Sequence, residues 1–165
     1  MIKIRKAKLK DINSIVTLEK KLIDHSDKII KNSYPENLKD FYFNKSRDEI
    51  AKKFIKNAIH SKNGLVIIAE NNEKILGYLL ITIRNNFSFF NLKKYGKLQT
   101  IYVKDEYRKM GISSKLMDEA IKWCIERGIK RISLDVLPNN FNAINIYKKW
   151  GFSPYLLEMR VDIRK

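Results

Sequence analysis

The hydrophobic residues in the first part of the chain follow two spacings, one typical of strands and the other typical of helices. Residues 2–5 alternate between isoleucine and a basic side chain, which indicates a half-buried strand. In residues 12–23 the apolar positions are spaced for one buried helical face, and a second helix is expected from Ser46 to about residue 62. The aromatic segment 33–44 between these helices indicates a loop or a short helical turn.

Two apolar runs in the middle of the chain predict a β-hairpin. Residues 65–69 are continuously apolar, the polar residues 71–74 follow as a turn, and residues 75–83 form the returning strand. The next segment, 84–97, has no regular period, so a long loop or two ragged strand ends are expected there. Its aromatic residues are expected either to pack beneath this loop or to face a ligand; they are Phe87, Phe89, Phe90 and Tyr95.

Strands and helices alternate in the second half of the chain. An apolar run at residues 101–103 leads through a charged connector into an amphipathic helix that ends at Gly128. Residues 132–136 alternate as a strand, which is parallel to the strand before it if the intervening helix makes the usual right-handed crossover. A helix around residues 143–147 is expected to precede a last strand at residues 155–163.

The connector before the amphipathic helix is a candidate anion site. A strand that runs into a helix leaves backbone N–H groups without partners, and the helix dipole favours an anion there. Arg108 and Lys109 add positive charge, and Gly111 lets a ligand approach the backbone. An ordinary solvated turn is the alternative. The six glycines of the chain are too dispersed to form a Walker loop or a dinucleotide-binding fingerprint.

Length and composition are those of one folded domain. The chain has 165 residues, 44% of them hydrophobic, and no repeat or linker divides it, so a single domain over residues 1–165 is expected. No apolar run reaches the roughly 18 residues of a spanning helix, and the amino terminus lacks the apolar region of a signal peptide. A cytoplasmic protein without a membrane partner is therefore expected.

The sequence predicts neither a disulfide nor a metal site. Cys124 is the one cysteine, and it lies between Trp123 and Ile125 in a predicted helix, where a buried hydrophobic role is expected rather than a reactive thiol. His25 and His60 are far apart and have no cysteine or histidine cluster around them. No metal is expected.

The formal net charge of +16 has two interpretations. It could attract phosphates, nucleic acid or acidic lipid surfaces through a long-range field. The basic residues are nevertheless scattered from Lys3 to Lys165, so a general lysine-rich composition is the other interpretation.

Three blocks of sequence resemble the GNAT superfamily of N-acetyltransferases. The first is the apolar run at residues 101–103. The second, Arg108-Lys109-Met110-Gly111-Ile112-Ser113, is similar to the family pattern (Q/R)-x-x-G-x-(G/A), and Ser113 replaces the small final residue. The third, residues 140–152, is similar to the pattern N-x-x-A-I-x-x-Y-x-x-x-G-F. Together with the order of strands and helices, the resemblance covers nearly the whole chain.

The resemblance implies a fold and an acetyl-CoA site. The fold class is α/β (α+β), a GNAT-like domain with a mixed, mostly antiparallel sheet of about six to seven strands and about four helices. A parallel strand pair splays apart at the acetyl-CoA site. The resemblance implies that main-chain groups of Ile101, Tyr102 and Val103 pair with the pantetheine arm. It implies that backbone amides hold the pyrophosphate, from Arg108, Lys109, Met110, Gly111, Ile112 and Ser113. Asn140 would hydrogen-bond the CoA arm, and Tyr147 would lie near the sulfur. For Asn140 a helix cap, and for Tyr147 a core aromatic, are the alternatives.

The implied reaction is acetyl transfer from acetyl-CoA to an amine. An alkyl amine with a pKa of about 10.4 is almost fully protonated at pH 7, so a base or a water path must remove a proton before attack. Asp135 is the candidate base, and an exposed or ion-paired carboxylate is its alternative. No motif pairs a serine or cysteine nucleophile with a histidine base, so direct transfer without an acetyl-enzyme is expected. Tyr147 is the candidate acid for the leaving thiolate.

The acceptor is an amine that the sequence does not identify: a small amine, a polyamine or a peptide amine. In the family, the segments corresponding to residues 24–43 and 84–97 shape the acceptor site. Four acidic residues there are candidates for recognising a cationic amine: Asp24, Asp27, Glu36 and Asp40. The family often pairs protomers, so a homodimer is a further candidate partner. A basic nucleic-acid-binding module and a CoA-binding regulator without turnover are the alternative functions.

Overall fold

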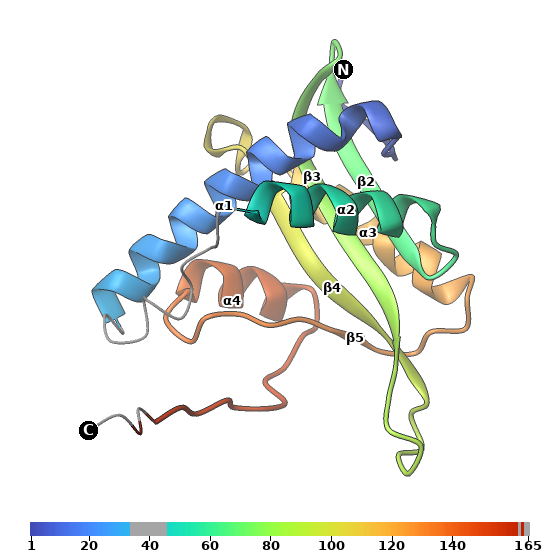
Figure 1. Ribbon diagram of the computed structural model, residues 1–165, viewed down its shortest axis with the longest axis vertical. Helices are drawn as coiled ribbons and strands as arrows, with labels where there is room; N and C mark the ends of the chain where they lie inside the picture. The colour runs from blue at the N-terminus through green and yellow to red at the C-terminus, as the bar shows by residue number, and fades with distance from the viewer. Residues whose placement is uncertain (34–45, 162, 164–165) are drawn as a thin grey trace. The chain divides into compact units, whose positions relative to one another are not determined.

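The structure, a computed structural model, describes residues 1–33, 46–161 and 163 (Figure 1). The chain folds into two compact units, Met1–Asp135 and Val136–Lys165. The single domain expected over residues 1–165 stays a prediction. None of the helices in the described ranges combines the length and the hydropathy that a bilayer-spanning segment needs.

The first unit is built on a mixed sheet with the strand order β1-β2-β3-β4-β5. Neighbours pair antiparallel from β1 to β4, and β5 pairs parallel with β4. The strands are β1 (Lys3–Lys6), β2 (Gly64–Asn71), β3 (Lys74–Asn85), β4 (Lys94–Val103) and β5 (Ile132–Ser133). The helices of this unit are α1 (Ile12–Ser33), α2 (Arg47–His60) and α3 (Ile112–Ile125). This arrangement confirms the predicted fold class and the parallel strand pair.

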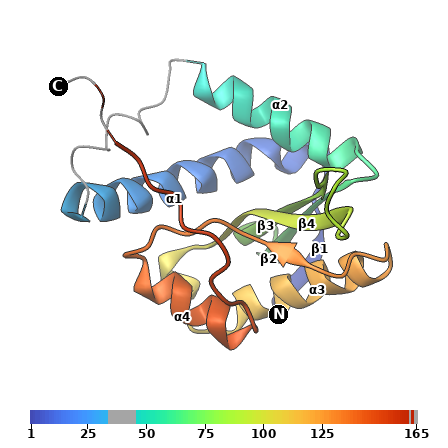
Figure 2. The same ribbon diagram turned by 90° about the horizontal axis from the view of Figure 1, so that it is seen from below.

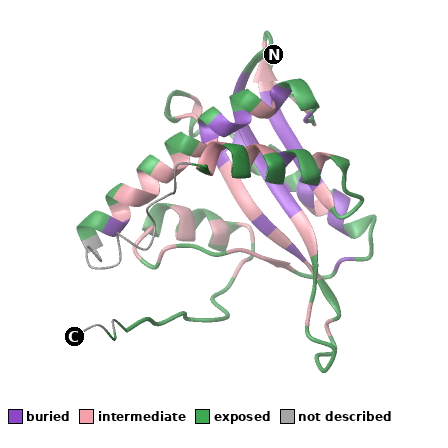
Figure 3. Ribbon diagram, in the orientation of Figure 1, coloured by how far each residue is buried: buried purple, intermediate pink, exposed green. Residues whose placement is uncertain are grey.

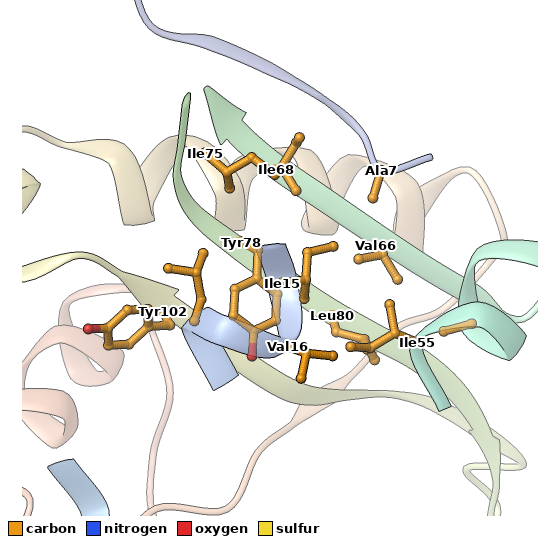
Figure 4. Close-up of a cluster of buried hydrophobic side chains, with 12 residues drawn as sticks. Ala7, Ile15, Val16, Ile55, Val66, Ile68, Ile75, Tyr78, Leu80 and Tyr102 are labelled. Atoms are coloured by element: carbon orange, nitrogen blue, oxygen red, sulfur yellow. The ribbon is translucent and has the colours of Figure 1, made fainter. Parts of the chain in front are cut away.

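Helices cover both faces of this sheet. Figure 2 shows α1 and α2 on one face and α3 on the other. Ile15 of α1 packs in a buried cluster with Val66 and Ile68 of β2 and with Tyr78 and Leu80 of β3 (Figure 4). The buried residues of α3 are Ile112, Leu116, Met117, Ala120, Trp123 and Cys124. Because both faces are covered, β2 and β3 read as continuous apolar runs rather than alternating ones.

Both strand connections in the middle of the chain are hairpins. The first turns at Asn72 and Glu73, whose φ angles of 47° and 63° are the left-handed conformation that tight hairpins require. The second connection is longer. β3 ends at Asn85 and β4 begins at Lys94, so residues 86–93 form the loop between them. The segment 84–97 is therefore two strand ends joined by a loop. The three phenylalanines of this loop are exposed, so the expectation that they pack beneath it is wrong.

The last expected strand is absent. Residues 155–161 and 163 form no strand and are exposed, so the described part of the chain has five strands rather than six or seven. Apolar character alone does not form a strand, because its backbone groups also need a partner strand. The first expected helix is α1, which ends at Ser33, where the loop was expected to begin; residues 34–44 of that loop lie outside the described residues.

Candidate functional site

The edge of β4 that faces β5 is open along most of its length. The two parallel strands pair only at Gly96 with Ile132 and at Lys97 with Ser133. From Leu98 to Val103, β4 pairs with β3 on its other side, and no described strand pairs with it on this side. An open strand edge presents main-chain donors and acceptors that an extended ligand can use. The predicted strand at residues 101–103 lies in this open part.

A β-bulge lies at the start of the open part. Leu80 pairs with Thr100, whereas the next residue, Ile81, pairs with Leu98, so Gln99 has no opposite partner in β3. The Gln99 side-chain amide donates a hydrogen bond of 3.1 Å to the hydroxyl of Thr82. Bulges bend a strand and recur beside functional sites. The bulge marks the point beyond which β4 no longer pairs with β5.

The connector from β4 to α3 offers a row of free amides. Amides in the first part of the connector already have acceptors: the Lys104 N–H donates to the Leu76 carbonyl at 2.9 Å, and the Arg108 N–H donates to the Asp105 carbonyl at 3.2 Å. In contrast, the backbone N–H groups from Lys109 to Ser113 donate no hydrogen bond within the described part of the chain. The predicted pyrophosphate amides are thus available at these positions, and the amide of Arg108 is already used.

Two residues of this connector have a left-handed backbone conformation. Lys109 has a φ of 62° and Gly111 a φ of 73°, both in the left-handed region. Left-handed residues within a run of successive amides produce the concave nests that bind anions. The first turn of α3 contains no acidic residue, so nothing there opposes a negative ligand.

Arg108 braces the connector against the end of β4. Its guanidinium lies 2.7 Å from the Asp105 carboxylate, donates from Nε to the Val103 carbonyl at 3.2 Å, and lies 5.7 Å from the centre of the Tyr102 ring. Burial and the Asp105 charge raise the pKa of Tyr102. Lys109, by contrast, is exposed beside the free amides.

Side-chain burial limits which predicted residues can contact a ligand through their side chains. Tyr102, Val103 and Ile112 are buried, so only their main-chain groups are accessible. Met110 is exposed and Ser113 is half-buried. The site predicted from the sequence is therefore largely a main-chain site in this unit.

Asp135, the candidate base, lies just after β5 on the surface. Its side chain is 88% exposed and accepts a hydrogen bond of 2.6 Å from the ammonium of Lys97 on β4. The ion pair ties the residues after β5 to the β4 strand. Exposure leaves this carboxylate well hydrated.

A second carboxylate, Glu19 on α1, lies closer to the interior. It is half-buried, accepts a hydrogen bond from the Tyr78 hydroxyl, and is also hydrogen-bonded by the side chain of Thr100 in the open part of β4. Loss of hydration raises the pKa of Glu19 above its usual value, although these hydrogen bonds and the charge of Arg47 oppose the change. Burial and the Glu19 charge raise the pKa of Tyr78 well above its usual value.

Sequence reasoning missed Glu19, although one signal was present. Glu19 follows Ile15 by four positions and Val16 by three, so it falls on the apolar face of the helix. A carboxylate on that face needs hydrogen-bonding partners inside the protein. The acidic candidates Asp24 and Asp27 lie on α1 as well, whereas Glu36 and Asp40 lie outside the described residues.

The second unit holds the two remaining predicted residues on or next to α4 (Phe141–Lys149). Asn140 caps this helix, since its side-chain oxygen accepts a hydrogen bond of 3.2 Å from the Ala143 N–H. The Tyr147 ring is half-buried, with its centre 5.8 Å from that of Trp150 and 5.9 Å from that of Phe152. Burial raises the pKa of the Tyr147 phenol.

No group of side chains in the described ranges is arranged to hold a metal ion. The arrangement instead offers main-chain donors at a basic helix terminus and an open strand edge. These are the features that an extended ligand with a diphosphate would use.

Comparison with known proteins agrees with this geometry. Residues 30–152 match the acetyltransferase (GNAT) family. The chain is 30% identical over 125 residues to an uncharacterized N-acetyltransferase of Archaeoglobus fulgidus, which covers 76% of this chain and 82% of that protein. It is 29% identical over 157 residues to an N-alpha-acetyltransferase of Sulfurisphaera tokodaii, which covers 91% of this chain and 79% of that protein.

A solved structure shares the fold. The crystal structure of a predicted acetyltransferase of Clostridium acetobutylicum with acetyl-CoA superposes with a TM-score of 0.77 at 23% identity, covering 99% of this chain and 97% of that one. The family match over most of the chain confirms the superfamily that the sequence motifs indicated. The chain belongs to the acetyltransferase (GNAT) family, as an acetyl-CoA-dependent N-acetyltransferase.

Proposed function

We propose that this protein transfers an acetyl group from acetyl-CoA directly to a primary amine. The row of free amides from Lys109 to Ser113, beside the open part of β4, is the observation that best supports this proposal. The amides hold the pyrophosphate, with Lys109 as an added cation. The pantetheine arm lies along residues 101–103 as an added strand.

The proposed reaction needs a base and an acid. The amine lone pair attacks the thioester carbonyl, its proton passes to a base, and the carbon–sulfur bond breaks to release the CoA thiolate. Asp135 is the base expected from the sequence, but its carboxylate is exposed and ion-paired with Lys97. Glu19, with its raised pKa and its hydrogen bond to Thr100, is therefore the base that we propose, and Asp135 is the alternative. Tyr147 protonates the thiolate, and its raised pKa keeps the phenol in the donating form. The side-chain NH₂ of Asn140 donates to the CoA arm.

The amino terminus of a peptide is the first acceptor class that we propose to test. The relative from Sulfurisphaera tokodaii, matched over most of both chains, is named an N-alpha-acetyltransferase. An α-amino group has a pKa of about 7.7–8.0, so a far larger fraction is unprotonated at pH 7 than for an alkyl amine. With such an acceptor, the base has to remove a proton from a smaller fraction of the amine molecules before attack. Polyamines and small amines are the other acceptor classes.

A thiol-release assay tests the proposal. Purified protein is incubated with acetyl-CoA and a panel of peptides, polyamines and aminoglycosides, and the acetylated product is identified by mass. Release that depends on the acceptor is the expected result. Binding of CoA without release for any acceptor points instead to a regulator without turnover. If calorimetry detects no CoA binding, both the site and the transfer reaction are wrong.

A further inference from the structure

The tip of the β3–β4 hairpin carries an exposed cluster of aromatic rings. Phe87, Phe89 and Phe90 are exposed by 70%, 76% and 44%. Figure 3 shows the loop that joins β3 and β4 mostly in the colour of exposed residues. The rings pack on one another, because the centres of Phe87 and Phe89 lie 5.4 Å apart with nearly parallel planes and those of Phe89 and Phe90 lie 4.6 Å apart. We call residues 86–93 the aromatic tip. It presents one compact apolar surface to solvent.

Hydrogen bonds within the aromatic tip give it a defined shape. The Asn86 N–H donates to the Lys93 carbonyl at 2.8 Å, and the Phe90 N–H donates to the Phe87 carbonyl at 3.1 Å. The ammonium of Lys93 donates to the Ser88 carbonyl at 2.6 Å. The rings are therefore held outward by ordered backbone, at the end of a hairpin whose two strands pair as far as Asn85 and Lys94.

Charge is distributed unevenly along this hairpin. Residues 84–97 contain four basic side chains and no acidic one. Lys97 is paired with Asp135. Arg84 and Lys94 lie on the strands at the base of the aromatic tip, and neither has an acidic partner in the described residues. The hairpin thus ends in an apolar cluster that is followed by a basic layer on its strands.

We propose that the aromatic tip binds the surface of an anionic lipid bilayer. The three rings enter the boundary between headgroups and acyl chains, and the basic layer behind them meets the anionic headgroups. This order of layers matches the order of a bilayer surface. The expectation of no membrane partner rested on the absence of a spanning segment, and a surface contact needs none.

Charge and ring geometry argue against two other occupants. Pairing two hairpins would bring together two copies of a segment, residues 84–97, that has four basic side chains and no acidic one to pair with them, which is unfavourable. Single-stranded nucleic acid binds aromatic side chains by stacking bases on free ring faces. Here Phe87 and Phe89 already cover each other, with 6° between their planes. The inference is independent of acetyl transfer and of the CoA site.

Vesicle co-sedimentation of the full chain tests the proposal. The probes are vesicles of phosphatidylcholine with phosphatidylserine, and vesicles of phosphatidylcholine alone. We expect binding to the anionic vesicles that weakens as salt rises, and much weaker binding to the neutral ones. The triple variant Phe87→Ser, Phe89→Ser, Phe90→Ser should bind at least about a hundredfold more weakly, because three apolar side chains no longer enter the bilayer.

Two further variants keep the test decisive. The single variant Phe89→Ser should lose about tenfold in binding, and it serves if the triple variant does not fold. Ile125→Ser is the matched control, since Ile125 is 68% exposed on α3, outside the hairpin, and it should bind as the unsubstituted protein does. The proposal is overturned if the protein does not bind anionic vesicles, or if the phenylalanine variants bind them as tightly as the unsubstituted protein does. It is equally overturned if single-stranded oligonucleotide displaces the vesicles, or if light scattering shows a dimer that the triple variant loses.

Discussion

The hydroxyl of Tyr78 on β3 donates a hydrogen bond to the carboxylate of Glu19 on α1. Tyr78 is fully buried, and Thr100 of β4 hydrogen-bonds the same carboxylate, so three elements of the first unit meet at one titratable group. Burial raises the pKa of Glu19 because the charged form loses hydration. This arrangement has consequences for stability and for catalysis.

The free energy of unfolding should fall as pH rises through the titration of Glu19. A carboxyl with a raised pKa binds its proton more tightly in the folded state, so its stabilising contribution is complete below the unfolded pKa and is lost above the folded pKa. The loss is about 1.4 kcal/mol for each unit by which the folded pKa exceeds the unfolded one. Urea unfolding from about pH 4 to pH 8 measures it. Glu19→Gln should remove this component, and Glu106→Gln, at an exposed position, should not. Identical pH dependence in all three proteins would contradict the prediction.

Glu19→Gln and Asp135→Asn distinguish the two candidate bases. We expect Glu19→Gln to lower kcat by about 10²- to 10⁴-fold and to remove the acid limb of the pH profile of kcat/KM. Asp135→Asn should change kcat less than about twofold, because its exposed carboxylate is ion-paired with Lys97. Initial rates of thiol release across the pH range provide the measurement. The opposite pattern would identify Asp135 as the base, and unchanged rates in both variants would favour a water path.

Gly111→Ala should weaken CoA binding, and Gly128→Ala should not. Both glycines have a positive φ, of 73° and 68°, and no atom lies within 4 Å of a Cβ built on either. Alanine therefore strains the backbone equally at both ends of α3, at a cost of about 1 kcal/mol in the free energy of unfolding. Only the change at Gly111 disturbs the free amides that are proposed to hold the pyrophosphate. Calorimetry with CoA and urea unfolding of both variants test this difference. Equal CoA affinity in the two variants would place the diphosphate elsewhere.

Tyr147→Phe should lower kcat and leave CoA affinity and stability nearly unchanged. The Tyr147 hydroxyl makes no hydrogen bond to the described residues, so its removal leaves no protein group without a partner. Loss of a general acid typically lowers the rate by about 10²- to 10⁴-fold. Steady-state kinetics, CoA calorimetry and thermal unfolding separate these effects. Tyr155→Phe, at an exposed position of the same unit, is the matched control. A parallel loss of stability and rate would instead support a core role for Tyr147.

The pattern of apolar residues predicted the secondary structure best where the residues that decide it are near one another in the chain, as in a single amphipathic helix or a tight hairpin. The β2–β3 hairpin and α3 were predicted for this reason. Spacing alone did not predict that residues 155–161 would lack a partner strand or that the phenylalanines of the aromatic tip would be exposed. Those outcomes depend on which other segments lie beside them.

By itself, the sequence determined the alternation of strands and helices, the family, and the main-chain character of the connector before α3. Each of these follows from residues that are near one another in the chain. Only the tertiary structure decided that β4 stays open beyond Lys97, that the amides from Lys109 to Ser113 have no internal partner, and that Glu19 meets Tyr78 and Thr100. Hydrogen bonding and burial depend on contacts between distant segments, and local periodicity does not specify those contacts.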